Sequence, residues 1–279
     1  MTRVSAPAEK DVGLGTAYER WAIYSCLETL CHELDVKSAM EGPYDGMAGI
    51  PGVHLLTQAH KGVDVLAVHE NDAGADQIRA VYAAHKLTHR LKCQVSSLPP
   101  KDCGVDLVFS FNALPLVEDW RAYVAALFST GAKYVVLAVT NPVSYGVYLR
   151  KALRVLEPSS NEPELFDHEA TKGDALTREL KRHGKILRHE YLDCPWWPDL
   201  FVSTGQSLLS GTLKRFGLTR KKQAPKSFIY GLNSFPYQNA DGAKELINAM
   251  KKHPGFEDAP HAIARIFGHH QLFVVAPAS

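Results

Sequence analysis

The sequence predicts an α/β fold: a doubly wound, mainly parallel seven-stranded sheet with helices on both faces and a cap inserted in the C-terminal half. The first observation behind this prediction is that candidate strands and helices alternate five times between residues 36 and 141, as parallel βαβ units do. The second is that most of these strands are unbroken apolar runs, which is typical of a sheet covered on both faces. The third is length, because 279 residues suffice for one large domain with a sizeable insertion.

The elements follow from local patterns, taken in chain order. Residues 14–34 carry apolar side chains such as Trp21, Leu27 and Leu34 at helical spacing, which predicts a leading helix. The core strands are predicted at 36–42, 63–70, 92–98, 104–114 and 132–142. The helices between and after them are predicted at 53–62, 73–87, 117–131 and 144–156. Residues 173–194 read as a helix that runs into another strand, and residues 269–277 read as the last strand.

The chain divides by composition into four parts. Residues 1–35 form an N-terminal helical segment, and residues 36–195 form the cofactor-binding core. Residues 196–262 change character, with a basic stretch and a segment rich in Pro and Asn, and are predicted to be a mostly helical cap. Residues 263–279 return to the core as its final strand.

Bulk composition excludes several classes of protein. The formal net charge of +1 gives no overall field that points to a nucleic acid or a membrane surface. The first dozen residues lack the apolar core of a secretion signal, and the five cysteines form no CxxC pair, so we expect free thiols in the cytoplasm. The histidines form no HExxH motif, and no metal site is expected. The sequence does not decide whether the protein is a monomer or a homodimer.

The segment "EGPYDGMAGIPG", residues 41–52, lies where the first core strand ends. Its glycines permit a close approach of the main chain to a ligand, and ligands of open α/β sheets bind at the carboxyl ends of the strands. Glu41 and Asp45 place two carboxylates in the same turn. They would repel a pyrophosphate and attract an ammonium or sulfonium group. The alternative is a turn that only reverses the chain.

Two further strand ends carry polar residues. Glu70 closes the second core strand, where an acid accepts hydrogen bonds from the ribose hydroxyls of a nucleoside cofactor. Asp72 follows it and is expected to cap the next helix. Asn112 leaves the fourth strand at the cleft where cofactor and acceptor would meet, although Asn also starts turns.

Together these pieces resemble the class I S-adenosylmethionine-dependent methyltransferases, in the branch that acts on small molecules. "MEGPYDGMAG" stands at the acidic, glycine-rich turn of that family, Glu70 at the acid of the second strand, and "VDLVFSFNALPLVEDW" at the fourth strand. The resemblance covers residues 36–141 well and the rest loosely. It implies S-adenosylmethionine as cofactor, held by Glu41, Gly42, Pro43, Asp45, Gly46, Gly49, Glu70, Ser97 and Asn112.

The sequence departs from the family pattern in two places. The glycine pattern is stretched, which leaves open whether Glu41 or Asp45 faces the methionine ammonium. The third strand ends in "CQVSSLPP" and lacks the acid that often holds the adenine amino group, so that Ser97, its neighbour Ser96 or main-chain groups would replace it.

The acceptor side of the cleft has its own candidates. His168 is the favoured general base, needed only if the acceptor holds a proton of high pKa, and Asn112 is the second catalytic candidate. Acceptor binding is assigned to Tyr145, Trp196, Trp197 and His269. Four of these residues have a structural alternative: a helix cap for His168, a plug between core and cap for Trp196 and Trp197, and the flank of the last strand for His269.

The predicted acceptor is a small molecule. The basic stretch 213–226 is either a solvated surface or a site for an anionic acceptor, and the low net charge favours a small one over a nucleic acid. Two other classes remain as alternatives. One is a nicotinamide-dependent oxidoreductase, whose loop should read GxGxxG with few acids. The other is a non-catalytic nucleoside-binding module.

Overall fold

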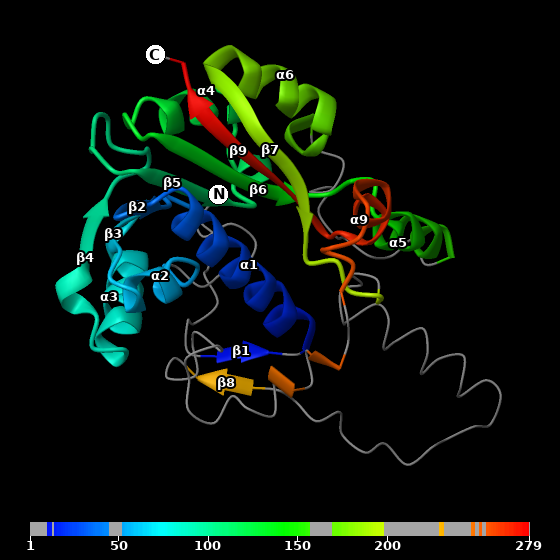
Figure 1. Ribbon diagram of the computed structural model, residues 1–279, viewed down its shortest axis with the longest axis horizontal. Helices are drawn as coiled ribbons and strands as arrows, with labels where there is room; N and C mark the ends of the chain where they lie inside the picture. The colour runs from blue at the N-terminus through cyan, green and yellow to red at the C-terminus, as the bar shows by residue number, and fades with distance from the viewer. Residues whose placement is uncertain are drawn as a thin grey trace.

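A computed structural model of the chain describes residues 10–12, 14–44, 52–156, 169–197, 229–231, 247–248, 251–252 and 255–278. Its centre is a seven-stranded sheet in the order β4-β3-β2-β5-β6-β9-β7 (Figure 1). The strands are β2 (Ser38–Glu41), β3 (Asp64–His69), β4 (Leu91–Val95), β5 (Leu107–Phe111), β6 (Tyr134–Thr140), β7 (Gly184–Leu192) and β9 (His270–Pro277). The predicted fold class is confirmed.

The sheet is mainly parallel, with one reversed strand inside it. β2 pairs in parallel with both β3 and β5, and β5 pairs in parallel with β6. β9 lies antiparallel between β6 and β7, so that β7 runs in the same direction as the parallel strands. Because β9 is reversed, its first residue, His270, pairs with Thr140 and Leu192 at the carboxyl ends of β6 and β7.

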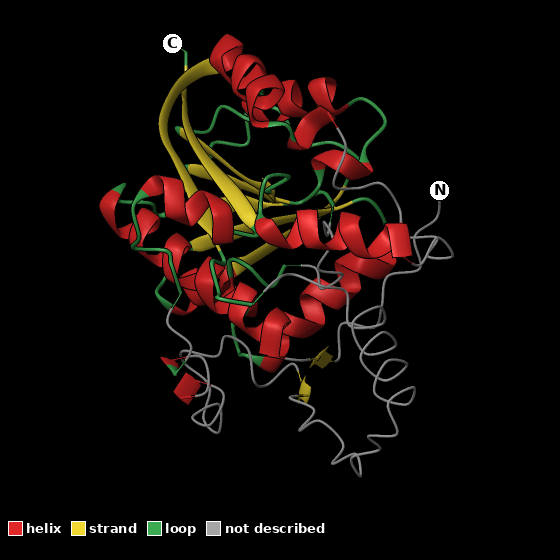
Figure 2. Cartoon of the chain, turned by 90° about the vertical axis from the view of Figure 1, so that its right-hand side faces the viewer, coloured by secondary structure: helices red, strands yellow, loops and turns green. Residues whose placement is uncertain are grey.

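Helices cover both faces of the sheet, as Figure 2 shows. They are α1 (Leu14–Glu33), α2 (Leu56–His60), α3 (Asp72–Ala84), α4 (Trp120–Phe128), α5 (Tyr145–Leu156), α6 (Gly173–His183) and α9 (His261–Phe267). One core cluster joins α1, α2 and α3 to one face, with Leu27, Ile78 and Phe109 among its buried members. A second cluster joins α4 and α6 to the opposite face through residues such as Val124 and Leu180. The sheet is therefore buried between two layers of helices.

Two elements differ from the prediction for local reasons. α2 begins at Leu56 instead of residue 53, and the amide of Leu55, the residue before it, is bonded to the carboxylate of Glu41. The cap of α3 is Asn71, whose side chain accepts a hydrogen bond from Gly74 N, so the assignment of this role to Asp72 was wrong. Asp72 is instead the first residue of the helix.

A small sheet was not expected from the sequence. β1 (Lys10–Val12) pairs antiparallel with β8 (Ile229–Gly231), which joins the start of the chain to the predicted cap. Most of residues 196–262 lies outside the described part of the chain, so the mostly helical cap and the domain boundaries stay predictions. None of the described helices has the length and apolar character needed to cross a membrane.

Candidate functional site

The strand order reverses beside β2. β3 and β4 follow on one side of it, and β5 and β6 on the other. In open α/β sheets, ligands bind outside the carboxyl ends of the strands at such a switch point. The residues that leave β2, β3, β4 and β5 therefore form the first half of the candidate site. The residues around the ends of β6 and β7 and the start of β9 form the second half.

The turn after β2 packs tightly against the neighbouring strand. Gly42 has a φ of +116°, and a Cβ atom there would lie 1.9 Å from the carbonyl oxygen of Val68 in β3. The carbonyl oxygen of Gly42 accepts a hydrogen bond from the hydroxyl of Tyr123 in α4 at 3.2 Å. Gly42 and Pro43 are both buried. The glycine is thus required by the close approach of two strands, which holds the turn in one position.

Glu41 is turned into the protein at the end of β2. It is 8% exposed, its Oε1 lies 2.6 Å from His54 Nδ1, and its Oε2 accepts a hydrogen bond from Leu55 N at 3.1 Å. The His54 ring in turn lies against Phe111, with centroids 4.7 Å apart. Glu41 therefore closes the loop between β2 and α2 and places a negative charge directly before α2.

Tyr44 contacts one predicted cofactor residue, Ser97, and lies near a second, Glu70, and the sequence reasoning missed it. Its hydroxyl donates to the carbonyl oxygen of Ser97 at 3.3 Å, which links the exits of β2 and β4. Partial burial raises the pKa of Tyr44, and the nearby charge of Glu70 raises it further. Tyr44 thus joins the turn after β2 to the exit of β4, with Glu70 of β3 near enough for its charge to act on the phenol. The signal was available, since Tyr44 is the one aromatic residue inside the glycine-rich turn.

Glu70 and Ser97 are exposed at the ends of their strands. The residue before Glu70, His69, is buried, and its ring occupies the space where a Cβ of Gly74 would lie. Asp45, Gly46 and Gly49 of the turn and the favoured base His168 lie outside the described residues, so their assigned roles stay predictions.

Asn112 links the two halves of the site. It is 1% exposed, has a left-handed φ of +46°, and follows β5 directly. Its Oδ1 accepts a hydrogen bond from Thr140 Oγ1 at 3.2 Å, and its Nδ2 lies 3.3 Å from His270 Nδ1. In this orientation the amide donates to Nδ1, and the proton of His270 resides on Nε2.

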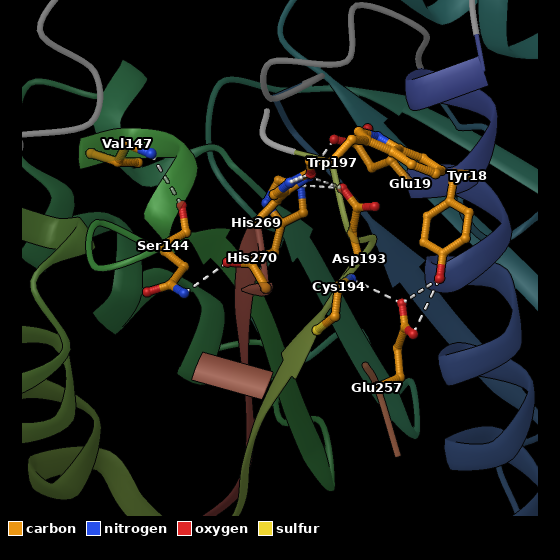
Figure 3. A network of polar contacts seen from close by, with 12 residues as sticks. Tyr18, Glu19, Ser144, Val147, Asp193, Cys194, Trp197, Glu257, His269 and His270 are labelled. Carbon is orange, nitrogen blue, oxygen red and sulfur yellow. Dashed lines mark hydrogen bonds and ion pairs between the residues drawn. The ribbon is translucent and has the colours of Figure 1, made fainter. Parts of the chain in front are cut away.

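His270 continues the chain of polar contacts to α1. Its Nε2 lies 2.9 Å from Glu19 Oε2, and Figure 3 shows the two side chains facing one another. Burial alone would raise the pKa of Glu19, but the hydrogen bond with His270 and the positive charge of the neighbouring Arg20 lower it below its usual value. The sequence reasoning assigned no role to Glu19, because nothing local connects two residues 251 positions apart.

A second histidine pair lies beside the first. His269 Nδ1 is 2.8 Å from Asp193 Oδ2, and His269 Nε2 is 3.3 Å from the carbonyl oxygen of Trp197. Asp193 follows β7 with a φ of +52° and is 3% exposed. Burial raises its pKa, and the charge of His269 opposes that rise only in part.

The four predicted acceptor residues meet in this second half. The hydroxyl of Tyr145 donates to the carbonyl oxygen of Trp196 at 2.5 Å. The Trp196 and Trp197 rings form an edge-to-face pair with centroids 5.8 Å apart, and Trp197 forms another with Tyr18 at 5.3 Å. His269 joins the group through its contact with Trp197. The structure thus gathers these residues, while their role in binding an acceptor stays a prediction.

A groove of about 800 Å³ runs beside this half of the site, between α1 and the edge strand β7. Tyr18 and Glu257 belong to its wall. Glu257 accepts hydrogen bonds from the hydroxyl of Tyr18 and from Cys194 N, the residue after Asp193 (Figure 3). The groove therefore lies next to the polar network around Asp193.

Comparison with known proteins gives a likeness of fold. No protein-family model matches the sequence, and no curated protein matches it. Among solved structures, the methyltransferase domain of bacterial CtHen1-C is 13% identical, with a TM-score of 0.46, and the match covers 64% of this chain and 89% of that one.

Two further structures match along most of this chain. A possible histamine N-methyltransferase from Thermotoga maritima is 8% identical with a TM-score of 0.46, covering 94% of this chain and 91% of that one. Geranyl diphosphate C-methyltransferase from Streptomyces coelicolor A3(2) is 12% identical with a TM-score of 0.44, covering 91% and 79%. These are described as methyltransferases, the class that the sequence resembles. At such identities and scores the likeness does not bear on activity, which must be argued from the residues of this chain.

Proposed function

We propose that the protein is an S-adenosylmethionine-dependent methyltransferase that acts on a small-molecule acceptor. The observation that carries this proposal is the position of Glu41. Dinucleotide-binding folds hold the pyrophosphate of their cofactor on free amides where the first helix begins. Here the amide immediately before α2 is already bonded to the Glu41 carboxylate. A phosphate group at this place would be repelled by the buried carboxylate of Glu41.

The same geometry favours a cationic donor. The bound cofactor would supply a methyl group on a positively charged sulfur, with an ammonium group on its methionine part. Glu41 contributes negative charge behind the turn, and Glu70 is exposed at the end of β3, where it would accept hydrogen bonds from ribose hydroxyls. Tyr44, which joins the turn to Ser97, offers an aromatic wall beside Glu70.

The residues of the second half of the site would bind and orient the acceptor. Methyl transfer from an activated sulfonium needs mainly orientation and exclusion of water. Asn112 stands between the halves, so that the donor side of the cleft and the histidine pairs meet at its amide. Trp196 and Trp197 would stack on a flat acceptor, and Tyr145 fixes the main chain that carries them. The proposed base, His168, acts only on an acceptor that must lose a proton.

The test is calorimetric titration of the purified full chain with S-adenosylhomocysteine and, separately, with NADH. We expect binding of S-adenosylhomocysteine alone. Binding of NADH alone would support the oxidoreductase and contradict the proposal. Binding of S-adenosylhomocysteine without any methylated product from metabolite extracts would favour the non-catalytic module.

Glu70→Ala sharpens this test. Loss of a charged hydrogen bond to the ribose should weaken S-adenosylhomocysteine binding by about 1–3 kcal/mol. Asp72→Ala is the matched control, because Asp72 is an exposed acid two positions away that has no assigned ligand. Equal affinities for Glu70→Ala and the wild type would show that the ribose does not lie at β3.

A further inference from the structure

Three side chains from distant parts of the chain bring atoms that can bind a metal ion close together at the carboxyl ends of the parallel strands. They are Glu19 of α1, Asp193 after β7, and His270 at the start of β9. One carboxylate oxygen of each acid and one ring nitrogen of the histidine all lie within 4.8 Å of one another. His270 Nε2 is 2.9 Å from Glu19 Oε2 and 3.8 Å from Asp193 Oδ2. Figure 3 shows Asp193 between the histidines and Glu19.

The hydrogen-bonding capacity of this group is incompletely satisfied among the described residues. Two carboxylates share a buried region, and the Nε2 proton of His270 is donated to Glu19, the nearer of them. Asp193 is 3% exposed, and its Oδ1 has no hydrogen-bond partner among the described residues. A buried carboxylate oxygen without a donor costs several kcal/mol in general, unless a proton or a cation satisfies it. Oδ1 is the second oxygen of the carboxylate whose Oδ2 lies 3.8 Å from His270 Nε2, so this carboxylate still has an acceptor position for a proton or a cation.

We propose that Glu19, Asp193 and His270 form a binding site for a first-row divalent cation of the Zn²⁺ or Mn²⁺ type. Two carboxylates and one imidazole are a donor set that such ions accept. Three protein ligands leave positions for water or a substrate oxygen, as sites that act on substrates do. The Glu19 side chain is 22% exposed and provides the route from solvent. This inference concerns the three residues alone and does not depend on methyl transfer.

The surroundings supply the outer contacts that a metal site needs. A histidine that binds a metal through one nitrogen usually donates its other N–H to an oxygen. The Asn112 amide faces His270 Nδ1, and Thr140, its other partner, has a hydroxyl that both donates and accepts. Rotation of the amide by half a turn would place Oδ1 against an Nδ1–H and free Nε2 for the ion. His269 Nδ1 likewise holds Asp193 Oδ2 in place.

The experiment measures metal content of the full chain. Protein treated with a chelator would be incubated separately with Zn²⁺, Mn²⁺ and Mg²⁺, passed over a desalting column, and analysed by elemental mass spectrometry. We expect about one Zn²⁺ or Mn²⁺ ion per chain and little Mg²⁺. Asp193→Asn and Glu19→Gln should each weaken binding about tenfold or more, since loss of even an outer contact has effects of that size.

Glu257→Gln is the matched control. It removes a neighbouring carboxylate that is bonded to Tyr18 and Cys194 and lies outside the trio, and it should keep the ion. Wild-type protein that retains none of the three ions would overturn the proposal. So would equal retention by the wild type and Asp193→Asn.

A measurement on the wild type alone covers the case in which the variants do not fold. Co²⁺ bound by two carboxylates and one histidine should give weak visible absorption bands without the intense thiolate band. Cys194, the residue after Asp193, is the nearby alternative ligand, and a thiolate band would assign the ion to it and contradict the proposed site.

Discussion

Two aspartates lie at opposite ends of the parallel strands and differ in how their carboxylates are hydrogen-bonded. The two ends are called the amino edge and the carboxyl edge of the sheet. Asp106, at the amino edge before β5, accepts hydrogen bonds from Lys37 N, Ser38 N and Ser38 Oγ through Oδ2, and its Oδ1 lies 2.7 Å from Lys133 Nζ. Asp193, at the carboxyl edge after β7, has one oxygen paired with His269, and its other oxygen has no partner in the part of the chain that the structure describes.

The pKa values of the two carboxyls follow from this difference. Partial burial alone would raise the pKa of Asp106, but hydrogen bonds from Lys133 and from the Lys37 and Ser38 amides lower it to about 2. Burial raises the pKa of Asp193, which has too few donors to reverse the effect. Asp106, which joins β2 to β5, has both of its oxygens satisfied. The incomplete satisfaction of Asp193 therefore indicates a role other than joining strands.

The largest expected effect is at Gly42, in the turn after β2 at the carboxyl edge. This glycine has a structural role in addition to any role in ligand binding. Gly42→Ala would push a Cβ to 1.9 Å from Val68 O at a φ of +116°. We expect a loss of about 3 kcal/mol or more in the free energy of unfolding, from backbone strain and overpacking together. Urea denaturation followed by circular dichroism measures it.

Gly104→Ala is the control for that experiment. Gly104 also has a positive φ, +68°, but a Cβ there meets nothing within 4 Å. It should lose only about 1 kcal/mol, the cost of the left-handed backbone. Similar losses in both variants would mean that the β2 turn does not press on β3, and that Gly42 is available for close approach to a ligand.

The amino edge should yield the next largest effect. Asp106→Asn is expected to cost about 1–2 kcal/mol at pH 7, since the side chain keeps some contact with water. Because the folded pKa is lowered, the stabilisation is present above the unfolded value of about 3.9 and is lost as the pH falls toward the folded value. The difference from wild type should therefore shrink between about pH 4 and pH 2.

Asp64→Asn is the matched control at the same edge. Asp64 begins β3 and forms an exposed ion pair with Arg90, with 67% of its side chain accessible. Exposed pairs contribute about 0–1 kcal/mol, so this variant should lose less. A pH-independent difference for Asp106→Asn would show that the carboxylate is not the stabilising species.

The sequence predicted the sheet because the information is local. Apolar runs, helical spacing and glycines mark β2 to β6 and their helices directly. The ends of β2, β3 and β4 were predicted as one site for the same reason, since parallel strands must end at one edge. Tyr44 lies in the same turn, but its contact with Ser97 joins two segments 53 positions apart and is not a local signal.

The network around Asp193 could not be predicted in this way. It joins α1 to a strand at the far end of the chain, and its contacts depend on β9 running antiparallel between β6 and β7. The pattern "HHQLFVVAP" shows a strand but not its direction. Direction decides whether His269 and His270 lie at the carboxyl edge or at the amino edge beside Asp106.

The smallest expected effect separates two neighbouring tryptophans at the carboxyl edge. The Trp196 side chain is exposed, at 55%, and its structural hydrogen bond to Tyr145 comes from the main chain, which a substitution keeps. Trp196→Ala should change the free energy of unfolding by less than about 0.5 kcal/mol. Trp197→Ala should cost about 1–3 kcal/mol, because its ring packs on Tyr18 and the core cluster of α1. Denaturant titration of both variants decides the matter: a comparable loss for Trp196→Ala would make it a packing residue like its neighbour, whereas no loss leaves its exposed ring available for an acceptor.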